Sequence, residues 1–311
     1  MIALTVVILV LVLFAILIAY ATYMMGFYWD RTKERDPLRL DTNEYAPYND
    51  LMIDQVGKIL QEPYEEVYIT SNDGLRLFGK YYERKAGAPV ELMVHGYHAV
   101  AERDFPFYLK YAFEREHNVL LIDQRSHGNS EGHTVCFGVK EREDVLLWCR
   151  YLVERLGEDV KILLEGVSMG SATVMMSTAL PLPENVKGVV ADCGYTSPED
   201  IIKLVIPAMV PVPVNAIYPF VKLGAVLFGH FSITSASAIE AMKTIKQPIL
   251  FIHGENDTFV PFYMVKELYD ACNSPLKCKY TVKNAPHARS TFEDYVGCAD
   301  ELGKFMDKLG I

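Results

Sequence analysis

The chain opens with its longest apolar run. Residues 1–29 contain no charged side chain, and Ile2–Met25 are almost wholly apolar. A helix needs about 20 apolar residues to cross a bilayer, so this run predicts a transmembrane helix at residues 1–29. Aromatic residues gather at the end of the run, where they fit the belt found at membrane interfaces: Tyr20, Tyr23, Phe27, Tyr28 and Trp29.

A cleaved signal peptide is the alternative for this segment. Ala19-Tyr20-Ala21 fits the small-residue pattern of a cleavage site. Signal peptides, however, carry a basic segment before an apolar core of about 7–15 residues. Here the apolar run is longer and no basic residue precedes it, which favours a retained anchor.

Residues 30–63 have the composition of a juxtamembrane linker. They mix both charges and carry Pro37, Pro47 and Pro63, with one short helix predicted around Asp50–Leu60. Basic residues follow the apolar run directly: Arg31, Lys33, Arg35 and Arg39. By the positive-inside rule they favour a catalytic domain on the cytoplasmic side.

From Tyr64 onward the pattern is that of an α/β domain. Val67–Thr70 and Leu75–Tyr82 are β-rich runs separated by Ser71-Asn72-Asp73-Gly74, a hairpin signal. Strand patterns then recur at Val90–Val94, Val119–Asp123, Val160–Leu164, Val186–Ala191, Ile249–Ile252 and Cys278–Val282. Helix patterns alternate with them, chiefly at Asp104–Glu116, Val139–Leu156, Tyr263–Cys272 and Thr291–Leu309. The alternation predicts a mostly parallel, eight-stranded sheet with helices on both faces, spanning residues 64–311.

One connection is too long for this rhythm. More than fifty residues separate the strands that end at Ala191 and begin at Ile249, and Ile201–Phe231 is apolar and rich in proline. Connections of this length are usually functional. We expect a small helical cap at about residues 198–240, and a helical pair packed on the sheet edge is the alternative. Asn215, Lys222 and the prolines argue against a second spanning helix.

The stretch Lys161–Thr178 holds the main candidate for chemistry. A strand pattern ends in Gly166-Val167-Ser168-Met169-Gly170, which fits G-x-S-x-G, and a small-residue helix pattern follows. Such a turn holds its serine in a strained conformation, and flanking glycines avoid collisions with the neighbouring strand and the helix. Ser168 is the predicted nucleophile, with an ordinary strand-to-helix turn as the alternative.

A serine nucleophile needs a base, and the base needs an acid to orient it. Asp257 stands just after a predicted strand, at the edge where active sites of open α/β sheets gather, and His287 lies in the loop after the last strand. The order Ser168, Asp257, His287 is that of an α/β-hydrolase triad. Glu255 and Asp192 are alternative acids, and a structural or solvated role is the alternative for His287.

The oxyanion formed during acyl transfer needs two convergent N–H donors. One is expected from Met169, which follows the nucleophile. The other is expected from Tyr97 in His95-Gly96-Tyr97, the loop after a predicted strand. His95 and His253 each precede a glycine at a strand end, so we expect them to stabilise turns and not to catalyse.

The composition of the chain limits which binding partners and cofactors are expected. The net charge of −10 and the pI near 5.3 argue against a nucleic-acid partner. The six cysteines are scattered, with no C-x-x-C and no His/Cys cluster, so neither a metal site nor a disulfide framework is predicted. No cofactor is expected.

Five motifs occur together and in order: His95-Gly96-Tyr97, Asp123-x-Arg125-x-x-Gly128-x-Ser130, Gly166-x-Ser168-x-Gly170, His253-Gly254-x-x-Asp257 and His287. In this combination the chain resembles the α/β-hydrolase superfamily. It is most similar to the serine aminopeptidase/monoglyceride lipase-like branch and its single-span, membrane-anchored bacterial members. The resemblance covers about Tyr64 to the C-terminus. It implies the α/β-hydrolase fold, with Ser168 as nucleophile, His287 as general base and Asp257 as its partner. The Asp123–Ser130 stretch matches a family loop that supports the active-site face, while the first 63 residues have no counterpart in the core fold.

These features predict a serine hydrolase that cleaves carboxylic esters through an acyl-enzyme on Ser168. Tethering and an apolar cap suit hydrophobic or lipid-derived acyl groups. A serine aminopeptidase or amidase is one alternative, for which Glu255, Asp192 and Glu199 are loose candidates to hold a free amine. A membrane-tethered binding module without catalysis is an alternative of another class.

Overall fold

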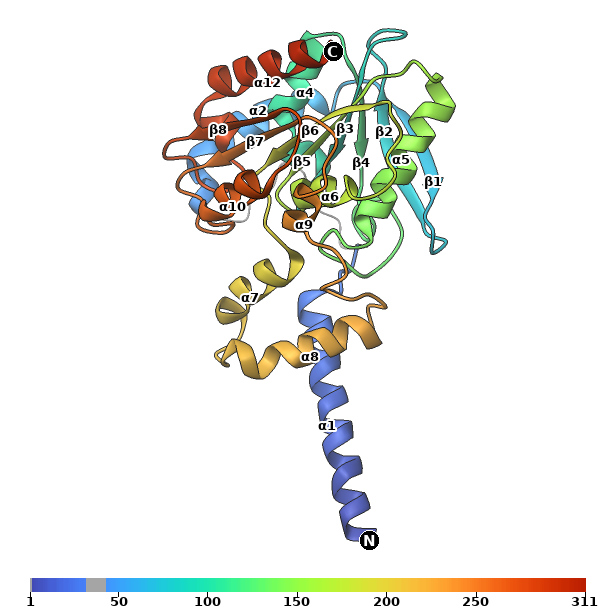
Figure 1. Cartoon of the computed structure of the whole chain (residues 1–311), viewed down its shortest axis with the longest axis vertical. Helices are drawn as coiled ribbons and strands as arrows, with labels where there is room; N and C mark the ends of the chain where they lie inside the picture. Colours follow the sequence, from blue (N-terminus) through green and yellow to red (C-terminus); the bar gives the residue numbers. More distant parts are fainter. Residues whose placement is uncertain (1, 32–42) are drawn as a thin grey trace.

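The computed structural model describes residues 2–31 and 43–311. A long helix, α1 (Ile2–Gly26), projects from an α/β domain built on one eight-stranded sheet (Figure 1). The strand order is β1-β2-β4-β3-β5-β6-β7-β8. The strands are β1 (Glu65–Thr70), β2 (Arg76–Tyr82), β3 (Val90–Val94), β4 (Asn118–Ile122), β5 (Ile162–Val167), β6 (Val186–Asp192), β7 (Ile249–Gly254) and β8 (Lys277–Val282).

The sheet confirms the predicted α/β-hydrolase fold. Strand β2 pairs antiparallel with β1 and with β4, and the pairs from β4 through β3 to β8 are parallel. The hairpin between β1 and β2 turns at Ser71 and Gly74, as the sequence predicts. Strands buried on both faces carry near-continuous apolar runs, which is why the pattern identifies them.

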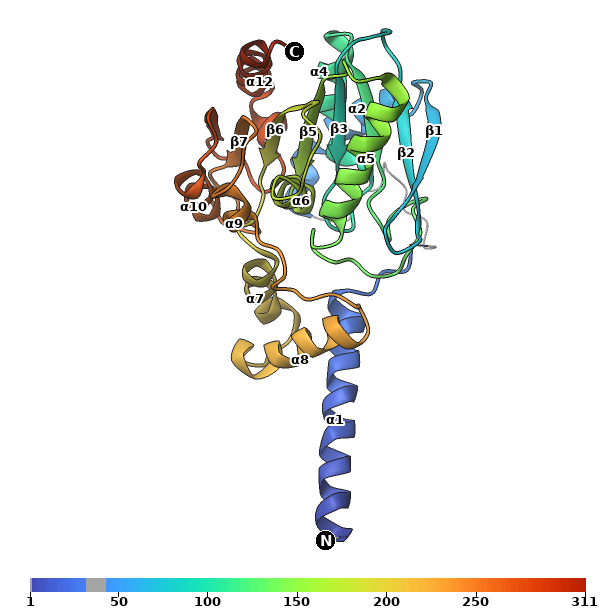
Figure 2. The same ribbon diagram turned by 45° about the vertical axis from the view of Figure 1, so that its right-hand side comes forward.

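Helices cover both faces of the sheet (Figure 2). Along β3, Leu92 and Val94 belong to one apolar core and Met93 to the other, because side chains alternate across a strand. The helices on the first face are α5 (Glu141–Leu156), α6 (Met169–Ser177), α9 (Ala238–Met242) and α10 (Tyr263–Ala271). The helices on the second face are α2 (Asn49–Ile59), α4 (Pro106–Glu114) and α12 (Tyr295–Leu309).

Two of the predicted helices have different bounds in the structure. The helix predicted at Asp104–Glu116 is α4, which begins at Pro106 because proline has no N–H to continue a helix, while Asp104 is the last residue of a separate short helix, α3 (Ala101–Asp104). The pattern at Thr291–Leu309 becomes α11 (Ser290–Glu293) and α12. Asp294 separates these two, since its carboxylate caps α12 by accepting the Gly297 N–H at 2.9 Å.

The two ends of α1 have different surroundings. Within the described residues, α1 is the one unbroken helix long and apolar enough to cross a membrane, and its first four turns are exposed. Toward its end, Ala19 is fully buried and Tyr23 is nearly so. Phe27, just beyond the helix, is 1% exposed and lies edge-to-face against Phe137 and Phe231, with ring centroids 5.8 and 5.3 Å away. The last turns of the predicted anchor therefore belong to the core of the α/β domain.

The long connection after β6 forms two helices, α7 (Pro198–Met209) and α8 (Val214–Leu227), bent by 118°. The expected cap is thus helical, but α8 packs across the end of α1 and not on the sheet edge (Figure 1). The crossing is close at Gly224, where a Cβ atom would lie 2.4 Å from the Ala19 carbonyl oxygen. The Thr22 hydroxyl donates across it to the Phe220 carbonyl at 3.1 Å.

Two carboxyl groups are buried side by side in the second core. Glu91 in β3 and Glu165 in β5 are each at most 1% exposed, and Glu91 Oε1 lies 2.7 Å from His117 Nδ1. Burial raises the pKa of both carboxyl groups, and the charge of Glu91 adds to the rise for Glu165. The folded chain therefore holds protons here that the unfolded chain releases at lower pH.

Glu165→Gln is expected to stabilise the protein at pH 8. A raised folded-state pKa means that stability falls as pH rises from the unfolded value, near 4.5, up to the folded value. The glutamine stays neutral, so we expect a gain on the order of 1–3 kcal/mol at pH 8 and little at pH 5. Unfolding midpoints at both pH values measure it, with the exposed Glu184→Gln as control. Parallel pH profiles for Glu165→Gln and wild type would contradict the assignment.

Candidate active site

Ser168 stands on a sharp turn between β5 and α6. Its backbone has φ 57° and ψ −117°, a conformation that side chains with a Cβ atom rarely adopt. Gly166 and Gly170 flank this turn at positions where there is no room for a side chain. A Cβ atom on Gly166 would lie 2.3 Å from the Gly170 carbonyl oxygen, and one on Gly170 would lie 1.8 Å from the Val94 carbonyl oxygen. The strand–turn–helix geometry expected from G-x-S-x-G is present.

The structure brings the three predicted triad residues together. His287 Nε2 lies 2.9 Å from Ser168 Oγ, and His287 Nδ1 lies 2.7 Å from Asp257 Oδ2. The three side chains come from the turn after β5, the loop after β7 and the loop after β8, and all are buried. The Ser168–His287 distance permits transfer of the hydroxyl proton to the imidazole, and the His287–Asp257 distance is that of a hydrogen bond that orients the ring.

Asp257 is held by donors on both carboxylate oxygens. Oδ1 accepts the N–H groups of Phe259 and Val260 at 3.0 and 2.8 Å, while Oδ2 faces His287 and lies 3.2 Å from His253 Nε2. Burial acts to raise the pKa of Asp257, but hydrogen bonds from His253 and His287 outweigh it and lower the pKa to about 2. Asp257 is therefore ionised at neutral pH. His253 also bonds the Val260 carbonyl at 2.9 Å, which fits the turn-stabilising role expected for it.

The alternative acids have other partners. Glu255 Oε1 accepts the Thr281 hydroxyl at 2.9 Å, and Glu255 is exposed. Asp192 Oδ2 accepts the Tyr108 hydroxyl at 2.9 Å inside the domain. Burial raises the pKa of Asp192 to about 6, against the lowering effect of that hydrogen bond. The histidine at the site thus pairs with Asp257.

The loop after β3 lies directly against the nucleophile. A Cβ atom on Gly96 would be 3.3 Å from the Ser168 Cβ atom. The Gly96 N–H donates to Asp104 Oδ2 at 2.7 Å, and the His98 N–H donates to His127 Nε2 at 3.1 Å. Tyr97 stands between these two fixed residues. Met169 is the first residue of α6, so its N–H belongs to the first turn, where helical N–H groups have no acceptor within the helix.

Histidine rings fix this loop from behind. His95 Nε2 accepts the Gln124 N–H at 3.0 Å, so its proton sits on Nδ1 and is donated to the Gly96 carbonyl at 2.7 Å. Burial lowers the pKa of His95 to about 4, and the ring is neutral. His127 is placed in the same way, accepting from His98 and donating through Nδ1 to the Arg125 carbonyl at 3.0 Å. His95 acts as the turn-stabilising residue that the sequence predicts.

Sequence reasoning did not place the end of α1 at this site. The Tyr97 hydroxyl donates to the Gly26 carbonyl at 3.3 Å, and the Trp29 ring stacks on His98 with centroids 3.5 Å apart. The backbone N–H of Trp29 donates to the His133 carbonyl at 2.8 Å. The end of α1 and the residues that follow it therefore pack against residues 97 and 98 in the loop after β3. Its only sequence signal is the aromatic cluster, which lipid contacts explain equally well.

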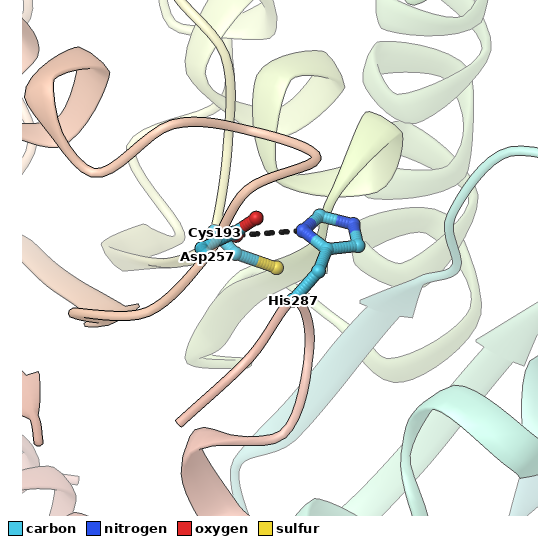
Figure 3. A group of neighbouring side chains, drawn as sticks. All are labelled: Cys193, Asp257 and His287. Atoms are coloured by element: carbon cyan, nitrogen blue, oxygen red, sulfur yellow. Dashed lines mark hydrogen bonds and ion pairs between the residues drawn. The ribbon is translucent and has the colours of Figure 1, made fainter. Parts of the chain in front are cut away.

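Cys193 lies beside Asp257 and His287, as Figure 3 shows, and one ligand atom from each falls within 4.8 Å of the others. A metal would need a thiolate and an available carboxylate oxygen. Burial raises the pKa of the Cys193 thiol well above its ordinary value, and the charge of Asp192 adds to the rise. Both Asp257 oxygens already accept hydrogen bonds. The cluster fits a hydrogen-bonded acid–base pair better than a metal site.

Comparison with known families agrees with this geometry. The alpha/beta hydrolase fold family matches residues 92–211, and the serine hydrolase (FSH1) family matches residues 167–285. The chain belongs to the α/β-hydrolase superfamily. Both matches include the Ser168 turn, and the second reaches from it to Ala285, just before His287.

Three similar proteins share between 24% and 33% identity with the chain over the aligned residues. The uncharacterized protein YqkD of Bacillus subtilis is 25% identical over 192 residues, which cover 62% of this chain and 63% of YqkD. The thiohydrolase aneE of Aspergillus aculeatus is 33% identical over 118 residues, 37% of each chain. The chain thus spans less than two thirds of the length of these two relatives. The Pyrococcus furiosus esterase Pf2001 superposes with a TM-score of 0.65 and 24% identity, over 81% of this chain and 93% of that one, which shows the shared fold.

Proposed function

We propose that this α/β hydrolase is a serine hydrolase that cleaves carboxylic esters through an acyl-enzyme on Ser168. The hydrogen-bonded sequence from Ser168 Oγ through His287 to Asp257 is the observation that supports it. Hydroxyl, imidazole and carboxylate in this geometry are what activation of a serine requires.

In the proposed reaction His287 Nε2 takes the Ser168 proton as Oγ attacks the ester carbonyl. The oxyanion accepts hydrogen bonds from the N–H groups of Met169 and Tyr97. His287 then gives its proton to the leaving alcohol, and water repeats the steps to release the acid. Asp257, ionised because its pKa is about 2, stabilises the imidazolium and holds the ring in the required tautomer. The mechanism needs neither metal nor cofactor.

The domain assignment is part of the proposal. Residues 1–29 form a retained membrane anchor, residues 30–63 a linker, and residues 64–311 the hydrolase domain, with the cap at about 198–240. Retention is supported by Ala19, the first residue of the A-x-A pattern, which is fully buried against α8, although Tyr20 and Ala21 are exposed. We place the domain on the cytoplasmic side because of the basic residues after the span. Of these, Arg31 is described, and Lys33, Arg35 and Arg39 lie outside the described residues.

Acyl chain length tests the substrate class. Full-length enzyme in mild detergent is expected to hydrolyse p-nitrophenyl esters, with kcat/KM rising from two-carbon to eight-carbon acyl groups by about tenfold or more. Each buried methylene contributes about 0.8 kcal/mol of binding energy, so an apolar site rewards length strongly. Equal kcat/KM for all lengths would contradict a hydrophobic acyl site. Faster cleavage of an aminoacyl amide, lost on N-acetylation, would favour the aminopeptidase, and no turnover of either class would favour a binding module.

Asp257→Asn is expected to lower kcat by about 10³–10⁴-fold, less than removal of Ser168 or His287. The amide keeps a partner beside the ring but stabilises the imidazolium poorly. The measurement is kcat at saturating ester, with Glu255→Gln as a matched control that should stay near wild type. An effect from Glu255→Gln as large as that from Asp257→Asn would contradict the assignment of the acid.

A further inference from the structure

The α7–α8 segment has an unusual outer surface. Between Leu204 and Leu227 fourteen residues are exposed, and Asn215 and Lys222 are the two polar ones among them. The twelve apolar ones are Leu204, Pro207, Ala208, Met209, Pro211, Val212, Pro213, Ala216, Pro219, Leu223, Val226 and Leu227. The outward face of a surface helix in a water-soluble domain normally carries charged and polar residues. Exposure of this apolar face to water is therefore unfavourable.

The apolar face is not the face that packs on the protein. Tyr218, Val221 and Ala225 of α8 are buried in the first core, and Gly224 meets α1 at Ala19. Leu223, Val226 and Leu227 are exposed at spacings that place them together on the other side of α8. In α7, the charged residues are confined to its start near the domain, where Lys203 pairs with Glu199 at 2.6 Å.

This face continues the apolar surface of α1. Helix α8 crosses α1 at Ala19–Tyr23, where Tyr20 contacts Phe228 with ring centroids 5.2 Å apart. Around the crossing, Tyr20, Met24 and Met25 of α1 are exposed, and below it α1 stands clear of the domain in both views (Figures 1 and 2). The exposed side chains of α8 thus lie beside the point where α1 leaves the domain, just after the exposed turns that precede Ala19 and that we call the bare part of α1.

We propose that α8 and its junction with α7 lie in the lipid interface of the membrane that α1 enters. This inference rests on the anchoring role proposed for α1. With 14 residues, α8 is about 21 Å long, too short to cross the bilayer core of about 30 Å, and the 118° bend prevents α7 from completing a span. A helix with an apolar face instead lies along the surface, buried about 5–10 Å deep. Lys222 can extend its ammonium group to the headgroups from that depth.

The arrangement has a consequence for the active site. The segment leaves the sheet after Asp192, at the carboxyl end of β6, and Ser168 follows the carboxyl end of the neighbouring strand β5. With α1 as the single membrane contact, the domain could rotate relative to the membrane. A second contact through α8 fixes its orientation. The edge of the sheet that carries Ser168 then faces the bilayer, and an acyl substrate reaches it from the leaflet.

Spin-label accessibility tests the proposal without reference to catalysis. The full chain with Cys278→Ser, which removes the one cysteine that is not buried, receives a nitroxide at L223C or V226C. Reference sites are L11C in the bare part of α1 and K266C on the exposed side of α10. Each variant is reconstituted at one chain per lipid nanodisc, so that a second copy cannot cover the face. Collision rates with oxygen report lipid, and those with a water-soluble nickel chelate report water.

We expect L223C and V226C to resemble L11C, with oxygen collisions several-fold above those at K266C and nickel collisions several-fold below. Nickel accessibility like that of K266C, with L11C in lipid, would overturn the proposal for α8 and leave the anchor intact. Protection that appears only when several chains share a disc would overturn it in favour of a second copy. Nickel accessibility at L11C would overturn the anchor and this proposal together, and the ester assays would still report on the triad.

Discussion

Ser168→Ala is expected to abolish covalent labelling by a fluorophosphonate and to lower ester turnover by about 10⁵–10⁶-fold. In the proposed mechanism Oγ is the atom that forms the acyl bond, so its loss removes the covalent route entirely. The substitution deletes one buried atom and keeps the Cβ atom in place, and we expect the unfolding midpoint to change little. His287→Ala should have an effect of the same size, and the double variant should lose no more than either single variant, because the residues act as one unit.

The chain provides a matched control for this experiment. Ser171 lies one turn further along α6, fully buried, and its hydroxyl has no hydrogen-bond partner among the described residues. Ser171→Ala should label and turn over like wild type. Labelling that persists in Ser168→Ala would place the reactive residue elsewhere. A folded wild-type chain that takes up no probe would remove the support for an activated serine.

Removal of residues 1–30 is expected to destabilise the domain by several kcal/mol and to reduce turnover strongly, whereas removal of residues 1–18 should do neither. The second fragment loses exposed turns of α1 and keeps Ala19, Tyr23 and Phe27 in the core. The first loses all three, together with the Gly26 carbonyl and the Trp29 ring, which contact Tyr97 and His98 in the loop after β3. Truncating one buried phenylalanine to alanine typically costs about 3–5 kcal/mol, and here several buried groups are lost together.

Both fragments are to be compared in the same detergent by denaturant unfolding and by ester turnover. Full-length Phe27→Ala separates packing from tethering, because it keeps the anchor and should still lose about 3–5 kcal/mol. Full-length Leu11→Ala, at an exposed position of α1, should leave unfolding of the domain unchanged. If the fragment that begins at Arg31 matched the one that begins at Ala19 in both assays, the end of α1 would be a tether and nothing more.

Much of the fold could be predicted because buried parallel strands need apolar runs and turns need particular residues. The strand–turn–helix at Ser168 could be predicted because Gly166 and Gly170 occupy places where a Cβ atom does not fit. Asp257 and His287 could be expected at the same edge of the sheet as Ser168 from their positions after strands. The break at Asp294 was missed, because helical periodicity runs on past a single interruption, and the start of α4 at Pro106 was placed two residues too early.

The packing of the end of α1 against the domain could not be predicted for a physical reason. Ala19, Tyr23 and Phe27 are as apolar as the residues before them, and hydropathy does not distinguish a side chain that faces lipid from one that faces a protein core. The boundary at residue 29 remains a prediction, and the packing of residues 19–29 with the domain is a finding. The same ambiguity applies to α8, whose two faces are both apolar.

The continuity of α1 from its bare turns into the domain core has a consequence for regulation by proteolysis. Many tethered enzymes can be shed, because a protease that cuts near the membrane frees an intact catalytic unit. Here a cut within residues 19–29 would remove buried side chains of the core and, in the same step, contacts to Tyr97 and His98 in the loop beside Ser168. The cut that released the domain from the membrane would then also inactivate it, so proteolysis would not produce an active soluble fragment.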